Sequence, residues 1–129
     1  MWKIKADRWR ESARLYARSG AALLRASLFP AWELRKLEGL SAGRRGSSEE
    51  AVLRHTGRWF ALLQRLGLRP SCLVCSLATA RVLREEGHDA HVVFGVCNDN
   101  GGMEGHCWVA VDGRPVSEVP ARFRELKRE

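Results

Sequence analysis

The stretch from Pro70 to Gly87, PSCLVCSLATARVLREEG, predicts a helix around which the rest of the chain can pack. Ser71 is suited to cap the helix start, and Gly87 is suited to end it, because glycine readily takes the left-handed conformation of a C-terminal cap. The apolar residues between them recur every three or four positions and so share one helix face. These residues are Leu73, Leu77, Ala80 and Leu83. We therefore expect a buried helix whose first residue is Cys72.

Upstream of this helix the chain is predicted to be helical, with one loop. Residues 6–26 space apolar side chains among arginines at helical intervals, which indicates an amphipathic helix. Pro30 interrupts the pattern, and a short helix to about Leu37 follows it. Residues 41–48, SAGRRGSS, have the composition of a loop, and the next helix is expected over residues 48–67.

Downstream of the central helix the sequence favours β-structure. Residues 90–96, 106–111 and 115–119 are rich in β-branched and aromatic side chains, and Asp-Gly stands at 112–113. This pattern predicts an antiparallel meander. Pro120 is expected to open a short charged helix that runs to the C-terminus. The predicted fold class is therefore α+β, with a helical N-terminal half packed on a small antiparallel sheet.

Size and composition indicate a single folded domain. The 129 residues suffice for one core, and the shares of hydrophobic (45%) and charged (29%) residues are those of a globular protein. The net charge of +7 is uneven, because residues 1–70 hold 15 Lys or Arg against 6 acids. Such a field favours an acidic partner, which charge alone leaves open among nucleic acid, an anionic membrane surface and an acidic peptide or protein. Solvated basic helix faces are the simpler explanation.

The four cysteines stand at positions 72, 75, 97 and 107, all in the second half of the chain. The N-terminus lacks the pattern of a signal peptide, and the apolar stretches are short, so we expect a cytoplasmic protein. Because cytosolic proteins of this size seldom rely on disulfides, we interpret the four cysteines as thiols.

Cys72 is the predicted nucleophile, because the first turn of a helix stabilises a thiolate through its unpaired N–H groups and its dipole. Cys75 lies one turn deeper and is expected, like Cys97 and Cys107, to be a buried apolar thiol. A thiol nucleophile also needs a base. His106, which opens a predicted strand after a Gly-rich loop, is the candidate, although a single strand histidine is more often a surface or packed residue.

A third group must orient the imidazole, and distance decides between two acids. Asp112 lies six residues along the same strand, roughly 20 Å from His106. Glu118 returns alongside His106 after the turn. A two-residue turn would pair 111 with 114 and put Glu118 on the wrong face, whereas a three-residue turn with a bulge pairs 108 with 118 and puts Glu118 on the His106 face. We therefore predict the longer turn.

Between Pro70 and Glu118 the chain resembles the leader peptidases of lasso-peptide biosynthesis, which are transglutaminase-like proteins of the papain superfamily. The motifs are Cys72-Leu73-Val74-Cys75-Ser76-Leu77, Gly95-Val96, His106-Cys107-Trp108-Val109 and Glu118. The resemblance implies that Cys72 is the nucleophile, that His106 is the base, and that Glu118 occupies the position where the family usually has Asp.

The resemblance implies a papain-like cysteine peptidase that releases the leader from a ribosomally made precursor before an ATP-dependent cyclase closes the ring. The expected partners are the precursor peptide, a separate leader-binding protein and, as a further candidate, the cyclase. Nucleic acid is not among them, membrane association stays open, and neither cofactor nor metal is expected. Residues 1–129 would form one transglutaminase-like domain, with a helical portion at 1–47 and a catalytic core at 48–129.

Other interpretations are weaker but stay open. Cys72, Cys75, His88 and His91 approach the spacing of a nucleic-acid-binding zinc finger. However, both cysteines fall on a predicted helix, and only two residues separate the histidines. The Cys-x2-Cys pair is also similar to a thioredoxin-like redox motif, without the βαβ pattern that should precede it. A transglutaminase-like domain can also be a non-catalytic peptide-binding module or an acyl-transfer enzyme.

Overall fold

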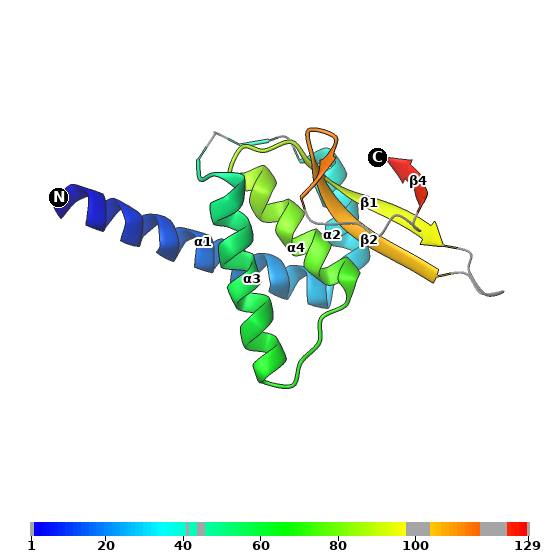
Figure 1. Ribbon diagram of the computed structural model, residues 1–129, viewed down its shortest axis with the longest axis horizontal. Helices are drawn as coiled ribbons and strands as arrows, with labels where there is room; N and C mark the ends of the chain where they lie inside the picture. The colour runs from blue at the N-terminus through cyan, green and yellow to red at the C-terminus, as the bar shows by residue number, and fades with distance from the viewer. Residues whose placement is uncertain (1, 41, 44–45, 98–103, 117–123, 129) are drawn as a thin grey trace.

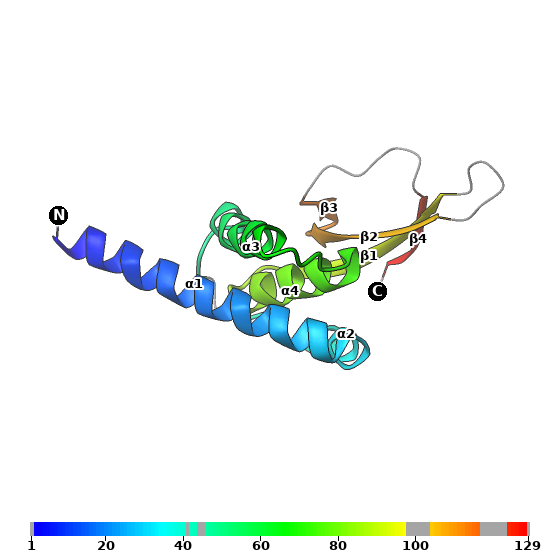
Figure 2. The same cartoon turned by 90° about the horizontal axis from the view of Figure 1, so that it is seen from below.

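The computed structural model describes residues 2–40, 42–43, 46–97, 104–116 and 124–128. Its elements are α1 (Trp2–Leu28), α2 (Pro30–Gly39), α3 (Glu49–Arg65), α4 (Cys72–Glu85), β1 (Ala90–Cys97), β2 (Glu104–Val111), β3 (Arg114–Pro115) and β4 (Arg124–Arg128). The helices gather on one side and the sheet on the other, with α4 in contact with α1, α2, α3, β1 and β2 (Figures 1 and 2). The α+β fold class is confirmed, and the helix predicted from residue 72 is its centre.

Local capping signals set where two of the helices begin. The Ser48 hydroxyl accepts a hydrogen bond from the Ala51 N–H at 3.2 Å, and the Ser71 hydroxyl accepts one from the Val74 N–H at the same distance. Each serine satisfies a backbone donor that has no partner inside its helix. Gly87 follows the end of α4 with φ of 91°, the conformation predicted for a C-terminal stop.

The boundary between the first two helices lies at Pro30, as predicted. α1 is longer than expected at both ends, and Pro30 is the first residue of α2, where its missing N–H costs no helical hydrogen bond. Figure 1 shows the first turns of α1 reaching beyond the other helices. None of the described helices combines the length and the hydropathy that a membrane-spanning segment needs.

The four-stranded sheet has the order β3-β2-β1-β4, and all neighbouring strands are antiparallel. The turn between β2 and β3 corrects one prediction, because Val111 pairs with Arg114 across a two-residue turn. The predicted three-residue turn with a bulge is therefore wrong. Asp112 and Gly113 have φ values of 51° and 82°, which is the positive-φ pair of a type I′ turn. That turn matches the twist of antiparallel strands and suits Asp-Gly.

The C-terminal segment corrects a second prediction. Residues 124–128 form strand β4 and not the charged helix expected after Pro120. β4 pairs with the side of β1 that β2 leaves open, with a register shift between Phe94 and Gly95. The residues Arg, Glu, Leu and Lys favour a helix, but backbone pairing with β1 satisfies N–H and C=O groups that would otherwise lack partners.

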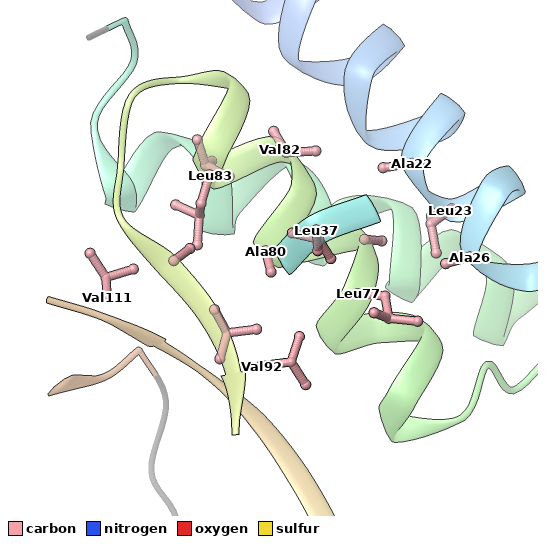
Figure 3. Packing of buried hydrophobic residues seen from close by; sticks show 14 of the residues in the cluster. Ala22, Leu23, Ala26, Leu37, Leu77, Ala80, Val82, Leu83, Val92 and Val111 are labelled. Atoms are coloured by element: carbon pink, nitrogen blue, oxygen red, sulfur yellow. The ribbon is translucent and has the colours of Figure 1, made fainter. Parts of the chain in front are cut away.

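The main core surrounds α4, which packs against α1, α2 and α3 on one side and against one face of the sheet on the other (Figure 3). Leu77 and Leu83 of α4 are fully buried against the sheet residues Val92, Val109 and Val111. Because side chains alternate along a strand, the intervening residues form a separate cluster, Val93, Trp108 and Ala110. The sheet therefore has two distinct faces, and only one of them meets α4.

A buried carboxylate fixes the C-terminal end of α4 to α1. Glu86 is 1% exposed, and it accepts hydrogen bonds from Arg14 at 3.0 Å, from the Ser47 N–H at 2.8 Å and from Arg18. Burial opposes its ionisation, but the Ser47 N–H and the Arg14 guanidinium outweigh burial and hold the pKa of Glu86 below its usual value. Glu86 is therefore a structural anion that joins three segments of the chain.

Candidate active site

Cys72 is the first residue of α4, immediately after the Ser71 cap, and it is exposed. The first turn of α4 contains no acidic residue, so this turn adds no negative charge beside the Cys72 thiol. The thiol is therefore accessible to a substrate or a reagent at the first turn of a helix. The structure thus places Cys72 as the sequence predicted.

A pocket of about 300 Å³ lies beside Cys72. Its wall combines residues of α3, α4 and β2, among them Phe60, Cys72, Cys75, His106, Cys107 and Trp108. Cys72 and His106 are 34 positions apart in the sequence, and the fold brings them to one pocket. A concave site with a few polar groups in an apolar wall is the usual form of a small-substrate site.

Cys107 is in contact with the Cys72 sulfur. The Cys107 thiol donates a hydrogen bond to the Cys72 Sγ at 3.3 Å, and the Ser76 hydroxyl donates one to the Cys107 carbonyl at 3.5 Å. Cys107 is 5% exposed and belongs to the core face of β2 with Val109. These contacts join the first turns of α4 to β2.

His106 lies on the other face of β2 from Cys107. Its imidazole centroid is 6.1 Å from the Trp108 ring, two residues along the strand, as alternation requires. Residues 106–109 all line the pocket, so both faces of β2 contribute to its wall. The structure therefore brings His106 to the pocket of Cys72 and places the Cys107 thiol in contact with the Cys72 sulfur.

Burial divides the three described thiols of the site into two kinds. Burial, followed by the hydrogen bond with Cys72, raises the pKa of Cys107 to about 12. Burial also raises the pKa of the Cys75 thiol, with a smaller contribution from the charge of Cys72. Cys75 and Cys107 are thus held as neutral thiols, and Cys72 is the exposed one.

The contact between Cys72 and Cys107 does not follow from the sequence pattern. The sequence predicts Cys107 as a buried thiol, and the burial is confirmed. The available signal was the alternation of Cys107, Val109 and Val111, which marks the strand face that packs on the central helix. Burial is only partial for Cys75, and the side chain of Cys97 lies outside the described residues.

The third predicted residue, Glu118, lies outside the described residues. The described register ends with Ala110 opposite Pro115 and with the Val116 N–H donating to the Val109 carbonyl at 2.9 Å. In this register residues 109–111 pair with residues 114–116 without a bulge. The predicted position of Glu118 on the His106 face required that bulge. Glu118 stays a prediction from the resemblance, and Asp112 is an exposed turn residue.

The four residues of the zinc-finger interpretation occupy different environments. Cys72 and Cys75 lie on the first turn of α4 and not on a hairpin. The His88 imidazole contacts the Ser47 carbonyl at 2.8 Å, and His91 contacts Asp89 and Arg84, each at 3.0 Å. Across the described ranges, no three His, Cys, Asp or Glu side chains are grouped to hold a metal ion.

Comparison with protein families matches residues 11–128 to the transglutaminase-like superfamily. The match leaves out only the first ten residues and the last one, and it includes every helix and strand described above in whole or in part. Neither the search of curated proteins nor the search of solved structures found a match. With helices, sheet and thiol pocket all inside the matched range, the chain belongs to the transglutaminase-like superfamily.

Proposed function

We propose that this protein is a papain-like cysteine peptidase with Cys72 as nucleophile and His106 as base. The observation that carries the proposal is the shared pocket, in which an exposed thiol at a helix start and an imidazole from β2 line one wall. The match to the transglutaminase-like superfamily over residues 11–128 includes both Cys72 and His106. Catalytic hydrogen bonds often tighten only when a substrate binds, so the shared pocket is the geometry that the proposed reaction needs.

The reaction follows from the chemistry of the two groups. The Cys72 thiolate attacks the scissile carbonyl and forms a tetrahedral oxyanion. The Cys72 backbone N–H belongs to the first helical turn, where no preceding carbonyl of the helix accepts it, so it is a natural donor to that oxyanion. The oxyanion collapses to a thioester as His106 protonates the leaving amine, and water then hydrolyses the thioester.

The proposed substrate is the leader of a ribosomally made lasso-peptide precursor. Support comes from the four spaced motifs between Cys72 and Glu118 and from the family. In this proposal a separate leader-binding protein presents the precursor, and the peptidase acts before an ATP-dependent cyclase. Glu118 would orient His106, and Glu118→Asp should then retain more activity than Glu118→Gln.

A surface at the junction of α1 and α2 supports a protein partner. Leu28, Phe29 and Trp32 are 61%, 60% and 50% exposed, an unusual concentration of large apolar side chains. Lys36 extends over the Trp32 ring, with its Nζ 4.3 Å from the centroid, and Arg25 is also exposed. An acidic partner with an apolar patch would complement this surface. The double charge reversal Arg25→Glu and Lys36→Glu should weaken the binding of this acidic partner to the protein. Unchanged binding of the partner would refute this docking site.

A non-catalytic peptide-binding module is the second candidate. The observation that favours it is the position of His106 on the strand face away from Cys107, while the Cys107 thiol occupies the contact with Cys72. Such a module would bind the precursor in the pocket without cleaving it.

The test is precursor cleavage in the presence of the leader-binding protein, followed by mass spectrometry. Cys72→Ala and His106→Ala should abolish cleavage, whereas Cys75→Ala, which removes a thiol from the same pocket wall, should retain it. Equal cleavage by the wild type and Cys72→Ala would refute the peptidase, and binding without cleavage by the wild type would favour the module.

A further inference from the structure

The Cys72 and Cys107 sulfurs come from two different elements and lie 3.3 Å apart. A disulfide has an S–S bond of about 2.05 Å, so the two sulfurs need to approach by little more than 1 Å. We propose that Cys107 is a resolving thiol that forms a reversible disulfide with Cys72, and that this bond blocks the nucleophile under oxidation. The blocking of catalysis rests on the proposed function, whereas the disulfide itself does not.

The two thiols differ in solvent exposure, as expected for a cysteine that is oxidised from solution and a second cysteine that then forms a disulfide with it. Cys72 is exposed and can meet a small oxidant from solution, while Cys107 is 5% exposed and sits behind it. Redox-sensitive cysteines are typically exposed, favour the thiolate and stand next to a second cysteine. Cys107 fills that second position, because its thiol already points at the Cys72 sulfur.

The oxidation proceeds in two balanced steps with a peroxide as the oxidant. The Cys72 thiolate attacks one oxygen of hydrogen peroxide, which breaks the O–O bond, gives the sulfenic acid and releases hydroxide. The Cys107 sulfur then attacks the Cys72 sulfur, and the sulfenic hydroxyl leaves with the Cys107 proton as water. A dithiol reductant reverses the bond by exchange and is itself oxidised to a disulfide.

Cys75 is the rival partner, and the contacts separate it from Cys107. It lies three residues after Cys72 on the same helix, and its thiol is directed to the Pro70 carbonyl at 4.0 Å. The Cys72 sulfur instead accepts its hydrogen bond from Cys107 on β2. Formation of the Cys72–Cys107 bond would therefore join α4 to β2, whereas a Cys72–Cys75 bond would close a single helical turn.

The experiment treats the reduced full-length protein with hydrogen peroxide, blocks the remaining thiols with N-ethylmaleimide and maps disulfides by mass spectrometry without reduction. The wild type and Cys75→Ser should both give the peptide pair linked through Cys72 and Cys107. Dithiothreitol should restore alkylation of Cys72 in both. In Cys107→Ser, and in Cys107→Ala as a second variant, Cys72 should pass to the sulfinic and sulfonic acids, which dithiothreitol does not reverse.

The result in the wild type alone is decisive, whether or not the Cys107 variants fold. A Cys72–Cys75 linkage, oxidation of Cys72 beyond the sulfenic acid without a linked peptide, or a Cys72 that stays alkylatable after peroxide would each overturn the proposal. Because mapping measures the bond and not peptide cleavage, a failure of the disulfide and a failure of the peptidase are distinguishable. If both hold, peroxide should abolish precursor cleavage and dithiothreitol should restore it.

Discussion

The three described cysteines around the pocket differ in chemistry because they differ in burial. Cys72 is exposed at the helix start, Cys75 is half-buried three residues further along α4, and Cys107 is buried on β2. A thiol reacts with reagents in solution as its thiolate, so burial and a raised pKa together protect Cys75 and Cys107 from such reagents. One pocket wall thus carries one reactive sulfur and two protected ones.

Alkylation of the native, reduced protein should therefore be selective. A rise in the pKa of Cys107 from 9.0 to about 12 lowers its thiolate fraction at neutral pH by roughly a thousandfold. We expect iodoacetamide to modify Cys72 first and to leave Cys107 unmodified until the protein unfolds. Peptide mapping over time, with a urea-unfolded sample as control, measures the two rates. Equal rates in the folded protein would contradict the assignment of Cys107 as a protected thiol.

At the scale of single elements, the two serine caps allow the role of the α4 start to be isolated. Ser71 and Ser48 make the same hydrogen bond at the same distance, but only α4 begins with a candidate nucleophile. Ser71→Ala and Ser48→Ala should each lower the free energy of unfolding by about 1 kcal/mol. If the full loss of about 1 kcal/mol in Ser71→Ala also raises the activation barrier of the Cys72 reaction, precursor cleavage slows by roughly fivefold. Ser48→Ala should not slow cleavage in this way.

The two measurements for this pair are urea unfolding and the rate constant of cleavage, supplemented by the alkylation rate of Cys72. Ser48→Ala is the matched control, because it removes a cap from α3 at the same cost in stability. A slowing of the same size in both variants would indicate a general loss of stability and not a specific effect of the α4 cap.

The elements also show why sequence prediction succeeded for helices and failed for two β features. The helix boundaries at Ser48, Ser71 and Gly87 depend on signals within a few residues, and these signals were sufficient. The turn at Asp112 was predicted from where Glu118 needed to lie for the proposed chemistry, although Asp-Gly itself favours the two-residue type I′ turn that forms. The local signal was the better guide.

The other failures depend on partners far apart in the sequence. Residues 124–128 have helical propensity, and only the position of β1 after folding makes a strand favourable. The contact between Cys72 and Cys107 likewise needs the packing of β2 on α4, which neither segment specifies alone. Alternation predicts which face of β2 Cys107 occupies, but it does not predict which residue of α4 meets that face.

At the scale of the whole molecule, Glu86 joins α1, the segment before α3 and the end of α4 through its charge. Glu86→Gln should lower the free energy of unfolding at neutral pH by about 2 kcal/mol, because it weakens charged hydrogen bonds in a buried position. Glu38→Gln, which removes the same charge at an exposed position, should have little effect.

This contribution should depend on pH with a defined sign. Since the native pKa of Glu86 lies below its usual value of 4.5, the stabilisation is present above pH 4.5 and is lost as the pH falls through the lower native value. The difference between the wild type and Glu86→Gln should therefore shrink in acid. Urea unfolding over a pH series measures it, and a difference that stays constant into strong acid would contradict the role of the Glu86 charge.

The pairing of β4 with β1 has a consequence for how the molecules meet one another. An exposed edge strand is a template for another chain, and β4 covers that edge of β1 with a run of charged residues, RELKR. Deleting residues 124–128 should expose the β1 template and cause self-association, which light scattering over a concentration series would detect. A deletion variant that stays monomeric at high concentration would contradict this protective role. The same short segment would then complete the sheet and keep it from recruiting a second molecule.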